Sequence, residues 1–467
     1  MTKPARFVII GADAAGMSAA SEARRLDPDV EIVAYDRGGF ASYSQCGLPY
    51  LVGGVVADRQ GLIARTVAAF AARGITVHLH HDVTAIDPVR RVIQVRNLQR
   101  ETDSAQPYDR LLIATGAVPV TPRVPGLGLT GVFGLDVMED AIALQDYLRT
   151  YQPRRAVIVG GGYIGLEMAE NLVRLGLQVR LIQRGEQLFP SVDMNMAPPL
   201  RQELERHGVD LRLCDSVLEA CEGDHGRVVD VDTNAGAVPT DLVLLATGVR
   251  PNTELALGAG IRCGPTGAIA VDDHLRTSVP DIFAAGDCAE HWHRLLARPA
   301  WVPLGTTANK QGRIAGRNAA GGDVAFAGIV GTAITRLFDL EVGRTGLSER
   351  EAGDAGLACV TTTLDSTDHA GYLPDARPLT LKVVAERDTG RLLGGQAVGR
   401  SGVDKRIDVL AVALYAGLTI EDLPRLDLAY APPFNSVWDP VQAAATALLR
   451  RDVSTDTEGH AVRPSRS

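Results

Sequence analysis

The chain has 467 residues, enough for about three domains of ordinary size. Hydrophobic residues make up 46% of it and charged residues 22%, which excludes a disordered chain and a fibrous repeat. The formal net charge of −9 gives no sign of a nucleic-acid surface, and no apolar run reaches the roughly 20 residues that span a bilayer. We therefore expect a cytoplasmic protein without nucleic-acid or membrane partners.

The N-terminal residues predict a strand, a glycine turn, a helix and a second strand. Residues 6–11 form a short β-branched run, residues 14–26 are rich in alanine with helical spacing, and residues 31–36 form another apolar run. Two strands joined by a helix make a βαβ unit, which implies a parallel sheet with right-handed crossovers. An α/β fold is therefore expected.

The same pattern recurs further along the chain, with strands at 155–160 and 178–183 and a helix at 163–176 between them. Residues 111–116 and 242–248 each end an apolar run in Ala-Thr-Gly and are followed by prolines. Clusters of proline and glycine after a strand are natural crossing points between domains. The second βαβ unit is therefore predicted to be inserted into the first.

These joints give the predicted domain boundaries. The first domain comprises residues 1–118 and 249–322, and the inserted domain comprises residues 119–248. Residues 323–450 contain longer alternating runs and then an Ala/Leu-rich helix, which indicates a separate α+β domain. Residues 451–467 are polar without periodicity, and we expect a disordered tail.

The first glycine turn, Gly11 to Gly16, lies where a Rossmann fingerprint belongs, with Asp13 in place of the middle glycine. Asp36 ends the second strand, where an acid can hydrogen-bond an adenosine ribose. A βαβ turn without a ligand is the alternative. The predicted cofactor contacts in this turn are Gly11, Ala15, Gly16 and Asp36.

The second turn has the complete fingerprint, with Gly160, Gly162 and Gly165. Its backbone N–H groups and the helix N-terminus favour a pyrophosphate. The position for an acid on an NAD ribose holds Gln183, and Arg184 follows, which favours the 2′-phosphate of NADPH unless Arg184 is only a solvated surface residue. Two dinucleotide sites are most simply explained by a flavin and a nicotinamide.

Residues 277–287 form an apolar strand that ends in Gly-Asp. With the two glycine turns and the two Ala-Thr-Gly joints, this segment resembles the FAD-dependent pyridine nucleotide–disulfide oxidoreductase superfamily. The resemblance implies an FAD domain with an inserted NAD(P)H domain, both Rossmann-like, and a C-terminal α+β dimerisation domain. It implies that Asp287 holds the ribityl chain of the flavin. Further cofactor contacts are implied for Thr115, Gly116, Gly248 and Gly286.

Cys46 lies in segment 42–50, a turn that contains Gly47 and Pro49, at the predicted start of a helix. A helix N-terminus there would lower the pKa of the thiol, whereas an isolated cysteine is as readily a buried structural residue. The six cysteines are scattered without a CxxC pair, so neither a disulfide framework nor a metal site is expected. We expect Cys46 to be the only essential cysteine, with the other five outside the flavin-proximal segment.

The dithiol members of the superfamily have a second cysteine close by and a C-terminal His-Pro…Glu motif, which this chain lacks. Residues 42–50 instead resemble the single-cysteine branch: coenzyme A disulfide reductases, NADH oxidases, NADH peroxidases and persulfide reductases. Their Ser-Phe-x-x-Cys-Gly-x-Pro-Tyr pattern is matched with Tyr43 in place of Phe, and Gln45 stands where coenzyme A disulfide reductases have Asn. Oxidases and peroxidases place a His in the first glycine turn, where this chain has Ala14.

The resemblance also implies residues near the substrate. Tyr430, in an Ala-Tyr-Ala-Pro-Pro segment, would reach the thiol from the partner subunit of a homodimer, and Tyr372 is the nearest match to a second tyrosine. The alternative for each tyrosine is a packed interface residue, and it carries more weight for Tyr372, where Leu373 replaces the usual second aromatic. Arg25 and Arg73 stand where the family binds the 3′-phospho-ADP end of coenzyme A, or they are solvated helix-end residues. Weaker matches for the pantetheine arm are Ser18, Ser42 and Gln45.

These resemblances imply a flavoprotein that passes electrons from NADPH, or alternatively NADH, through FAD to Cys46. The implied substrate is a small disulfide, most simply coenzyme A disulfide, or a persulfide or polysulfide. One alternative is an NAD(P)H oxidase or peroxidase in which Cys46 cycles through sulfenic acid. The other is an electron-transfer flavoprotein reductase with a protein partner, which needs no redox cysteine.

Overall fold

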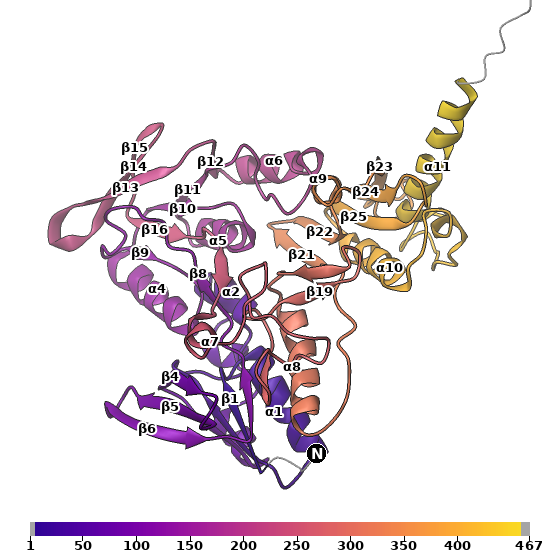
Figure 1. The fold of residues 1–467 in the computed structure, drawn as a ribbon. Coiled ribbons are helices and arrows are strands. Elements are labelled where there is room, and N and C mark those ends of the chain that lie inside the picture. Colours follow the sequence, from indigo (N-terminus) through magenta and orange to yellow (C-terminus); the bar gives the residue numbers. More distant parts are fainter. Residues whose placement is uncertain (1–4, 459–467) are drawn as a thin grey trace, which may run out of the picture. The chain divides into compact units, whose positions relative to one another are not determined.

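The structure is a computed structural model that describes residues 5–458 (Figure 1). The chain divides into two compact units. The first unit contains the residues up to Arg184, together with Asp215–His293 and Ala297–Ile329. The second contains Gly185–Cys214, Arg294–Leu296 and the residues from Val330 onward. Because both βαβ units fall in the first unit, the residue boundaries of the three predicted domains stay a prediction.

The first parallel sheet is built as the N-terminal sequence predicts. Its strand order is β18-β7-β1-β2-β3, and every neighbouring pair is parallel. Helix α1 (Ala14–Leu26) connects β1 to β2, so the predicted βαβ unit is confirmed. The strands of this sheet are β1 (Arg6–Ile10), β2 (Glu31–Tyr35), β3 (Ile75–His78), β7 (Arg110–Ile113) and β18 (Ile282–Ala284).

The second parallel sheet repeats the arrangement. Strands β11, β10, β16 and β9 are neighbours in that order, and α5 (Tyr163–Arg174) connects β10 to β11. These strands all precede β18, which returns to the first sheet. The predicted insertion of one Rossmann-like unit in the other is therefore confirmed. Their bounds are β9 (Val132–Phe133), β10 (Arg155–Val159), β11 (Gln178–Gln183) and β16 (Leu242–Leu245).

Helix α8 (Gly305–Ala319) lies against α1 at very close range. A Cβ on Gly312 would lie 2.2 Å from the carbonyl oxygen of Ala15, and one on Gly316 would lie 2.2 Å from that of Ala19. Larger residues at these two positions would force the helices apart, because well-packed interiors have no room for them. The glycines of α8 therefore bring its N-terminal half beside the first glycine turn.

Shorter elements complete the first unit. A small antiparallel sheet, β4-β5-β6, follows β3, a second one, β13-β14-β15, follows α5, and β8 pairs with β17. Their bounds are β4 (His81–Asp87), β5 (Val92–Asn97), β6 (Thr102–Pro107), β8 (Ala117–Pro119), β13 (Val217–Glu222), β14 (Val228–Thr233), β15 (Gly236–Pro239), β17 (Val249–Pro251), β19 (His291–His293) and β20 (Arg298–Ala300). The short helices are α2 (Leu48–Val52), α3 (Val67–Ala71) and α7 (Glu254–Gly258), and α4 (Met138–Tyr151) is longer.

The second unit is an antiparallel sheet with helices, as the α+β prediction requires. The strand order is β21-β22-β25-β24-β23, and α10 (Val403–Ala416) packs on β25 and β22. The buried side chains of α10 share one apolar core with β24 and β25. The other elements are β12 (Asp210–Leu213), β21 (Ala333–Leu337), β22 (Leu340–Gly346), β23 (Cys359–Thr367), β24 (Pro378–Glu386), β25 (Leu392–Gly399), α6 (Pro198–Arg206), α9 (Glu349–Asp354) and α11 (Pro440–Glu458).

Helix α11 extends into the segment 451–467, for which a disordered tail stays a prediction. The helix continues to Glu458, because a helix whose first turns are packed in the core extends at little further cost. Residues 459–467 of the predicted tail lie outside the described residues.

Candidate active site

The first glycine turn is closed so tightly that side chains are excluded from it. Gly11 has a φ of +103°, and a Cβ on it would lie 2.1 Å from a carbonyl oxygen just beyond β7. A Cβ on Gly16 would lie 1.9 Å from the carbonyl oxygen of Gly11. The Asp36 carboxylate accepts hydrogen bonds from the backbone N–H groups of Ala12 at 2.7 Å and Gly38 at 2.8 Å. Asp36 therefore orients the turn that it was predicted to serve.

The second glycine turn has the same construction. Gly160 has a φ of +110°, and a Cβ on Gly165 would lie 2.0 Å from its carbonyl oxygen. By contrast, a Cβ on Gly162 would meet nothing within 4 Å. Open space at the middle of the turn is what a pyrophosphate needs in order to approach the backbone. Gln183 accepts from the N–H of Gly161 at 3.0 Å, as Asp36 does in the first turn.

The two Ala-Thr-Gly joints meet in the structure. Strands β8 and β17, which follow them, pair antiparallel. The Thr115 hydroxyl donates to the carbonyl of Asn252 at 2.7 Å, and the Asn252 amide donates back to the carbonyl of Thr115 at 3.2 Å. Gly116 and Gly248 have positive φ angles, and a Cβ on either would meet nothing within 4 Å. The predicted contacts therefore gather at one crossing between the sheets, and Asn252 is a residue that the sequence did not indicate.

Asp287 lies just after β18, with an unsatisfied carboxylate oxygen. Among the described residues nothing bonds its buried Oδ1 atom, and burial raises the pKa of Asp287 to about 6. The preceding Gly286 has a φ of +83° and donates to the side chain of Gln311 on α8 at 2.9 Å. A buried acceptor without a donor is costly unless a ligand supplies one. A ribityl hydroxyl would do so, and the residues present therefore fit FAD.

The segment before Cys46 is attached to the first glycine turn. The N–H of Ser42 donates to the carbonyl of Ala12 at 2.9 Å, and the N–H of Tyr43 donates to Oδ1 of Asp13 at 3.1 Å. Ser42 has a φ of +49°, an unusual value for a residue with a side chain. Cys46 follows in a 3₁₀ turn, Gln45–Gly47, and its side chain is exposed. The turn that would bind a pyrophosphate therefore also positions the thiol.

The prediction that a helix end lowers the pKa of Cys46 is wrong for this structure. Desolvation raises the pKa of the thiol, and the negative charges of Glu167, Asp287 and Asp13 raise it further. Helix α2, which follows the thiol, has only five residues, so its dipole is weak. Glu167 on α5 is a functional candidate that sequence reasoning missed, because only the folded chain brings it near Cys46.

The expectation for the other cysteines also needs one correction. Cys288 directly follows Asp287, so it does lie in the flavin-proximal segment. Its buried thiol donates to the carbonyl oxygens of Ile113 and Ala285, each at 3.4 Å. A buried thiol with two backbone partners serves packing rather than redox chemistry. Cys46 as the only essential cysteine stays a prediction.

The cations predicted for coenzyme A lie near the C-terminal end of α1. Arg25 bonds the carboxylate of Glu22, with its Nε at 3.0 Å. Arg24 donates to the carbonyl of Gly74 at 2.8 Å, which places the exposed Arg73 beside this end of the helix. Arg25 is thus already paired with Glu22, and the binding of coenzyme A phosphates by Arg25 and Arg73 stays a prediction.

The polar residues predicted for the pantetheine arm are partly engaged. The Ser18 hydroxyl donates to the side chain of Asn309 on α8 at 2.7 Å. The Gln45 amide donates to the carbonyl of Asp136 at 2.9 Å. The backbone N–H of Ser42 donates to the carbonyl of Ala12. Their role in substrate binding stays a prediction.

The two predicted tyrosines are neighbours in the second unit. Tyr372 is 74% exposed and Tyr430 is 49% exposed. Desolvation, the charge of Tyr430 and a hydrogen bond with that residue raise the pKa of Tyr372. Beneath them the buried Arg406 donates to the carbonyl of Asp368 at 2.7 Å and to Oδ1 of Asn435 at 2.9 Å. Arg406 thus joins the two loops that carry the tyrosines. In the sequence, the only indication of this role is a single arginine in an otherwise largely apolar helix, α10.

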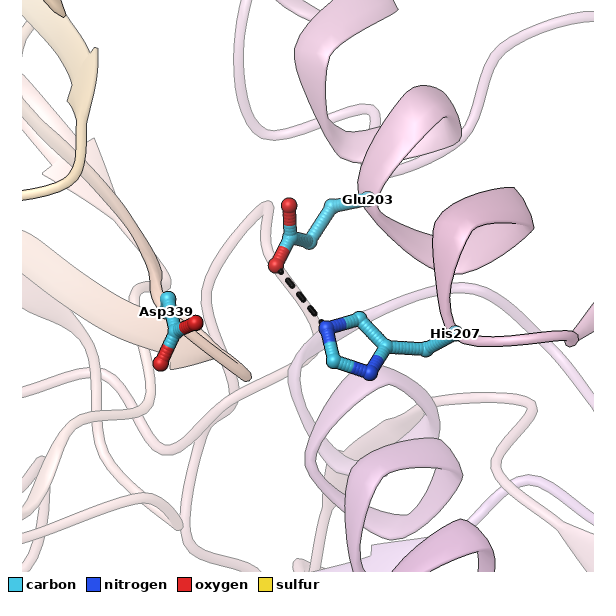
Figure 2. A group of neighbouring side chains, drawn as sticks. All are labelled: Glu203, His207 and Asp339. Atoms are coloured by element: carbon cyan, nitrogen blue, oxygen red, sulfur yellow. Dashed lines mark ion pairs between the residues drawn. The ribbon is translucent and has the colours of Figure 1, made fainter.

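A cluster outside the predicted site has the composition of a metal centre. Figure 2 shows the carboxylate of Glu203 facing the imidazole of His207, with Asp339 opposite, and the Glu203 and His207 atoms are 3.3 Å apart. Arg206 and Arg400, however, lie 2.5 and 2.7 Å from the two oxygens of Glu203. Two guanidinium groups already neutralise this carboxylate, so the cluster is an ion-pair network rather than a cation site.

Comparison with known proteins identifies the family. Residues 5–312 match the family model described as pyridine nucleotide-disulphide oxidoreductase, and residues 332–441 match the dimerisation domain of the same family. The chain belongs to the pyridine nucleotide-disulphide oxidoreductase family. It is therefore an oxidoreductase, and its cofactors are FAD and NAD(P)H.

Relatives in the family share nearly the whole chain. The NAD(P)H coenzyme A polysulfide/persulfide reductase of Pyrococcus horikoshii is 40% identical over 95% of this chain and 98% of its own. A coenzyme A disulfide reductase of Staphylococcus aureus is 33% identical over 93% of this chain and 97% of its own. The solved structure of an NAD-dependent persulfide reductase from A. fulgidus superposes with a TM-score of 0.93 at 38% identity, over 96% of this chain and 84% of that one.

The comparisons confirm the family that the motifs indicated and the two-Rossmann architecture. They do not test the individual site residues, whose roles stay predictions. In residues 5–458, no helix is long and apolar enough to cross a membrane.

We predict that Glu167→Gln lowers the pKa of Cys46. The substitution removes the negative charge that raises this pKa most after desolvation. Alkylation of Cys46 by iodoacetamide, followed by mass spectrometry across a range of pH, should then be faster at neutral pH, because only the thiolate reacts.

Glu170→Gln is the matched control. Glu170 is on the same helix, and its carboxylate pairs with Arg174 at 2.9 Å. An unchanged alkylation profile in Glu167→Gln, or an equal shift in Glu170→Gln, would contradict the assignment.

Proposed function

We propose that this enzyme passes electrons from NADPH through FAD to Cys46, and that Cys46 reduces coenzyme A disulfide or a persulfide of the same thiol. The observation that carries the proposal is the exposed Cys46 thiol, attached through Tyr43 and Ser42 to the first glycine turn. The names of the Pyrococcus and Staphylococcus relatives support a substrate built on coenzyme A.

One thiol suffices because the substrate supplies the second. The Cys46 thiolate attacks one sulfur of coenzyme A disulfide, so that a Cys46–coenzyme A disulfide forms and one coenzyme A thiolate leaves with the electron pair of the broken bond. Two electrons from NADPH then break the mixed disulfide, release the second coenzyme A and return Cys46 as a thiolate. One proton from NADPH and one from solvent end on the two coenzyme A thiols. FAD, when bound, supplies the two-electron relay between nicotinamide and sulfur.

Residues of this chain would hold the reactants. Asp287 would accept from the ribityl chain, and the turn of Gly160 and Gly162 would bind the nicotinamide pyrophosphate. Arg25 and Arg73 would face the phosphates of coenzyme A. Proton transfer to the leaving thiolates would come from a phenol, since a tyrosine hydroxyl can donate.

The oxidase alternative is less well supported. An oxidase would take Cys46 through sulfenic acid, and the histidine that oxidases and peroxidases place in the first glycine turn is replaced by Ala14, whose side chain has no proton to donate. All six cysteines lie in the described residues and all are free, which supports a reducing compartment such as the cytoplasm.

Cys46→Ser should keep FAD and hydride transfer from NADPH to the flavin, and lose reduction of coenzyme A disulfide by orders of magnitude. Stopped-flow absorbance follows the flavin, and free thiol production follows the substrate. Cys288→Ser is the control, because its thiol is buried and donates to the carbonyl oxygens of Ile113 and Ala285. Disulfide reduction by the Cys46→Ser protein at a comparable rate would instead favour the electron-transfer alternative.

NADPH is proposed as the preferred reductant because Gln183 replaces the acid and Arg184 is exposed beside it. Arg184→Ala should raise the KM for NADPH by about one to two decades, since a lost charge-assisted contact costs roughly 1.5–3 kcal/mol. The KM for NADH should hardly change. Steady-state kinetics with both nucleotides decide, and equal effects would contradict the assignment.

A homodimer is proposed in which the partner subunit's Tyr430 completes the site around Cys46. The matched dimerisation domain supports this, as do exposed apolar residues beside the tyrosines, including Phe434 and Trp438 at 73% and 61% exposure. Surfaces this apolar are usually covered in the functional assembly.

Subunit mixing tests this arrangement. Cys46→Ser and Tyr430→Phe homodimers should each be impaired, and their mixture should regain partial activity, because one site in a hybrid carries both native residues. Mixed tags and native mass spectrometry confirm exchange. Verified exchange without recovery would refute the shared site.

A further inference from the structure

Asp13 occupies the middle position of the first glycine turn, where a glycine ordinarily lets a pyrophosphate approach the backbone. It is the residue that precedes α1, yet its side chain makes no cap on that helix. Instead, its Oδ1 atom accepts from the N–H of Tyr43 at 3.1 Å. The backbone N–H of Ala14, the first residue of α1, also interacts with this carboxylate, so the charge of Asp13 lies at the phosphate-binding turn itself.

The largest charge effects on Asp13 come from two other carboxylates. They are Asp36, at the end of β2, and Asp287, after β18. Tyr43, on the adjacent loop, donates only its backbone N–H, and the charge of Asp13 in turn raises the pKa values of the Tyr43 phenol and the Cys46 thiol. Burial and these two carboxylates together raise the pKa of Asp13 to about 7.

The cofactor adds more negative charge at this place. FAD carries a pyrophosphate with two negative charges, and the family membership of the chain makes FAD its cofactor. A carboxylate beside a dianion in a site of low dielectric is strongly disfavoured, whereas a protonated carboxyl group is neutral and can donate a hydrogen bond. The bond from Tyr43 survives protonation, because the carbonyl oxygen of the acid still accepts it.

We propose that Asp13 is a proton-carrying residue of the FAD site, and that the enzyme holds FAD with Asp13 as the neutral acid. FAD binding therefore takes up a proton at any pH at which Asp13 of the free protein is ionised. The inference depends on FAD as the cofactor and not on the disulfide substrate, so it stands whether or not coenzyme A is that substrate.

The sign of the pH dependence follows from linkage. A group whose pKa is higher in the bound state favours binding below its free-state pKa and weakens it above. Because the pKa of Asp13 in the free protein is about 7, the ionisation of Asp13 should affect the affinity for FAD little below that pH. Above it, the Kd should rise about tenfold per pH unit until the bound state also ionises.

The test uses the full-length holoenzyme in a Cys46→Ser background, which removes the thiol titration. Equilibrium dilution, read by the fluorescence of released flavin, gives the Kd of FAD between about pH 6 and pH 9. Asp13→Asn keeps an oxygen for the N–H of Tyr43 but cannot ionise, so its Kd should lose the rise above about pH 7. Asp109→Asn is the matched control: Asp109 accepts from backbone N–H groups at the opposite end of β1, at 2.9 and 2.8 Å, and its variant should keep the rise.

Infrared difference spectroscopy provides the second readout. Holoenzyme at about pH 8 should show the carbonyl stretch of a protonated carboxylic acid, shifted in D₂O and missing in Asp13→Asn. If Asp13→Asn fails to fold, Asp13→Gly restores the ordinary fingerprint and replaces it in both measurements. The same pH slope in the Asp13 variants as in the parent protein, or a protonated-acid band that persists in them, would overturn the proposal. A protein that failed to reduce coenzyme A disulfide would contradict the proposed function but not the proposal for Asp13. The two proposals can therefore be refuted independently.

Discussion

Contact between backbones, without intervening side chains, is the constraint on which the rest of this structure depends. At Gly11, Gly16, Gly160 and Gly165 a single added carbon would lie about 2 Å from a carbonyl oxygen. Each pair of glycines therefore fixes how its helix leaves its strand, and so fixes where the helix N-terminus is presented. In the first unit that geometry also sets the place of the cysteine loop, which is bonded to the same turn through Ser42 and Tyr43.

A second feature of the FAD site is that several carboxylates lie in it, although the pyrophosphate it binds is an anion. Asp13, Asp36 and Asp287 come from three different strand ends, and each has a raised pKa because burial removes water from it. Backbone N–H groups carry the positive potential instead of lysines or arginines. Such a site binds anions well only if its acids are hydrogen-bonded or protonated. Asp36 meets the condition with two backbone donors, and the orphaned oxygen of Asp287 leaves a place for a ligand donor.

The sequence predicted most of the local structure because strands, turns and helices here follow short-range patterns. Helix α1 and strand β11 have the bounds that the apolar spacing indicated, and the insertion followed from two repeated strand ends. The electrostatics could not be predicted in the same way. Glu167 reaches Cys46 from another βαβ unit, and α2 proved to be one short turn, so the direction of the thiol pKa depended on tertiary contacts. It could likewise not be predicted from the sequence that the buried Arg406 joins the loops of Asp368 and Asn435.

The raised pKa of Cys46 is consistent with a thiol that receives electrons before it attacks. A cysteine that must deprotonate in water needs a low pKa, as in enzymes that pair it with a cation. A cysteine released from a mixed disulfide by two electrons emerges as a thiolate and needs no base in that turnover. Between turnovers, a raised pKa disfavours the thiolate of this exposed thiol, and the thiolate is the form that is readily oxidised. The carboxylates around Cys46 therefore cost the reductive half of the proposed cycle little, because that half delivers the thiolate without a base.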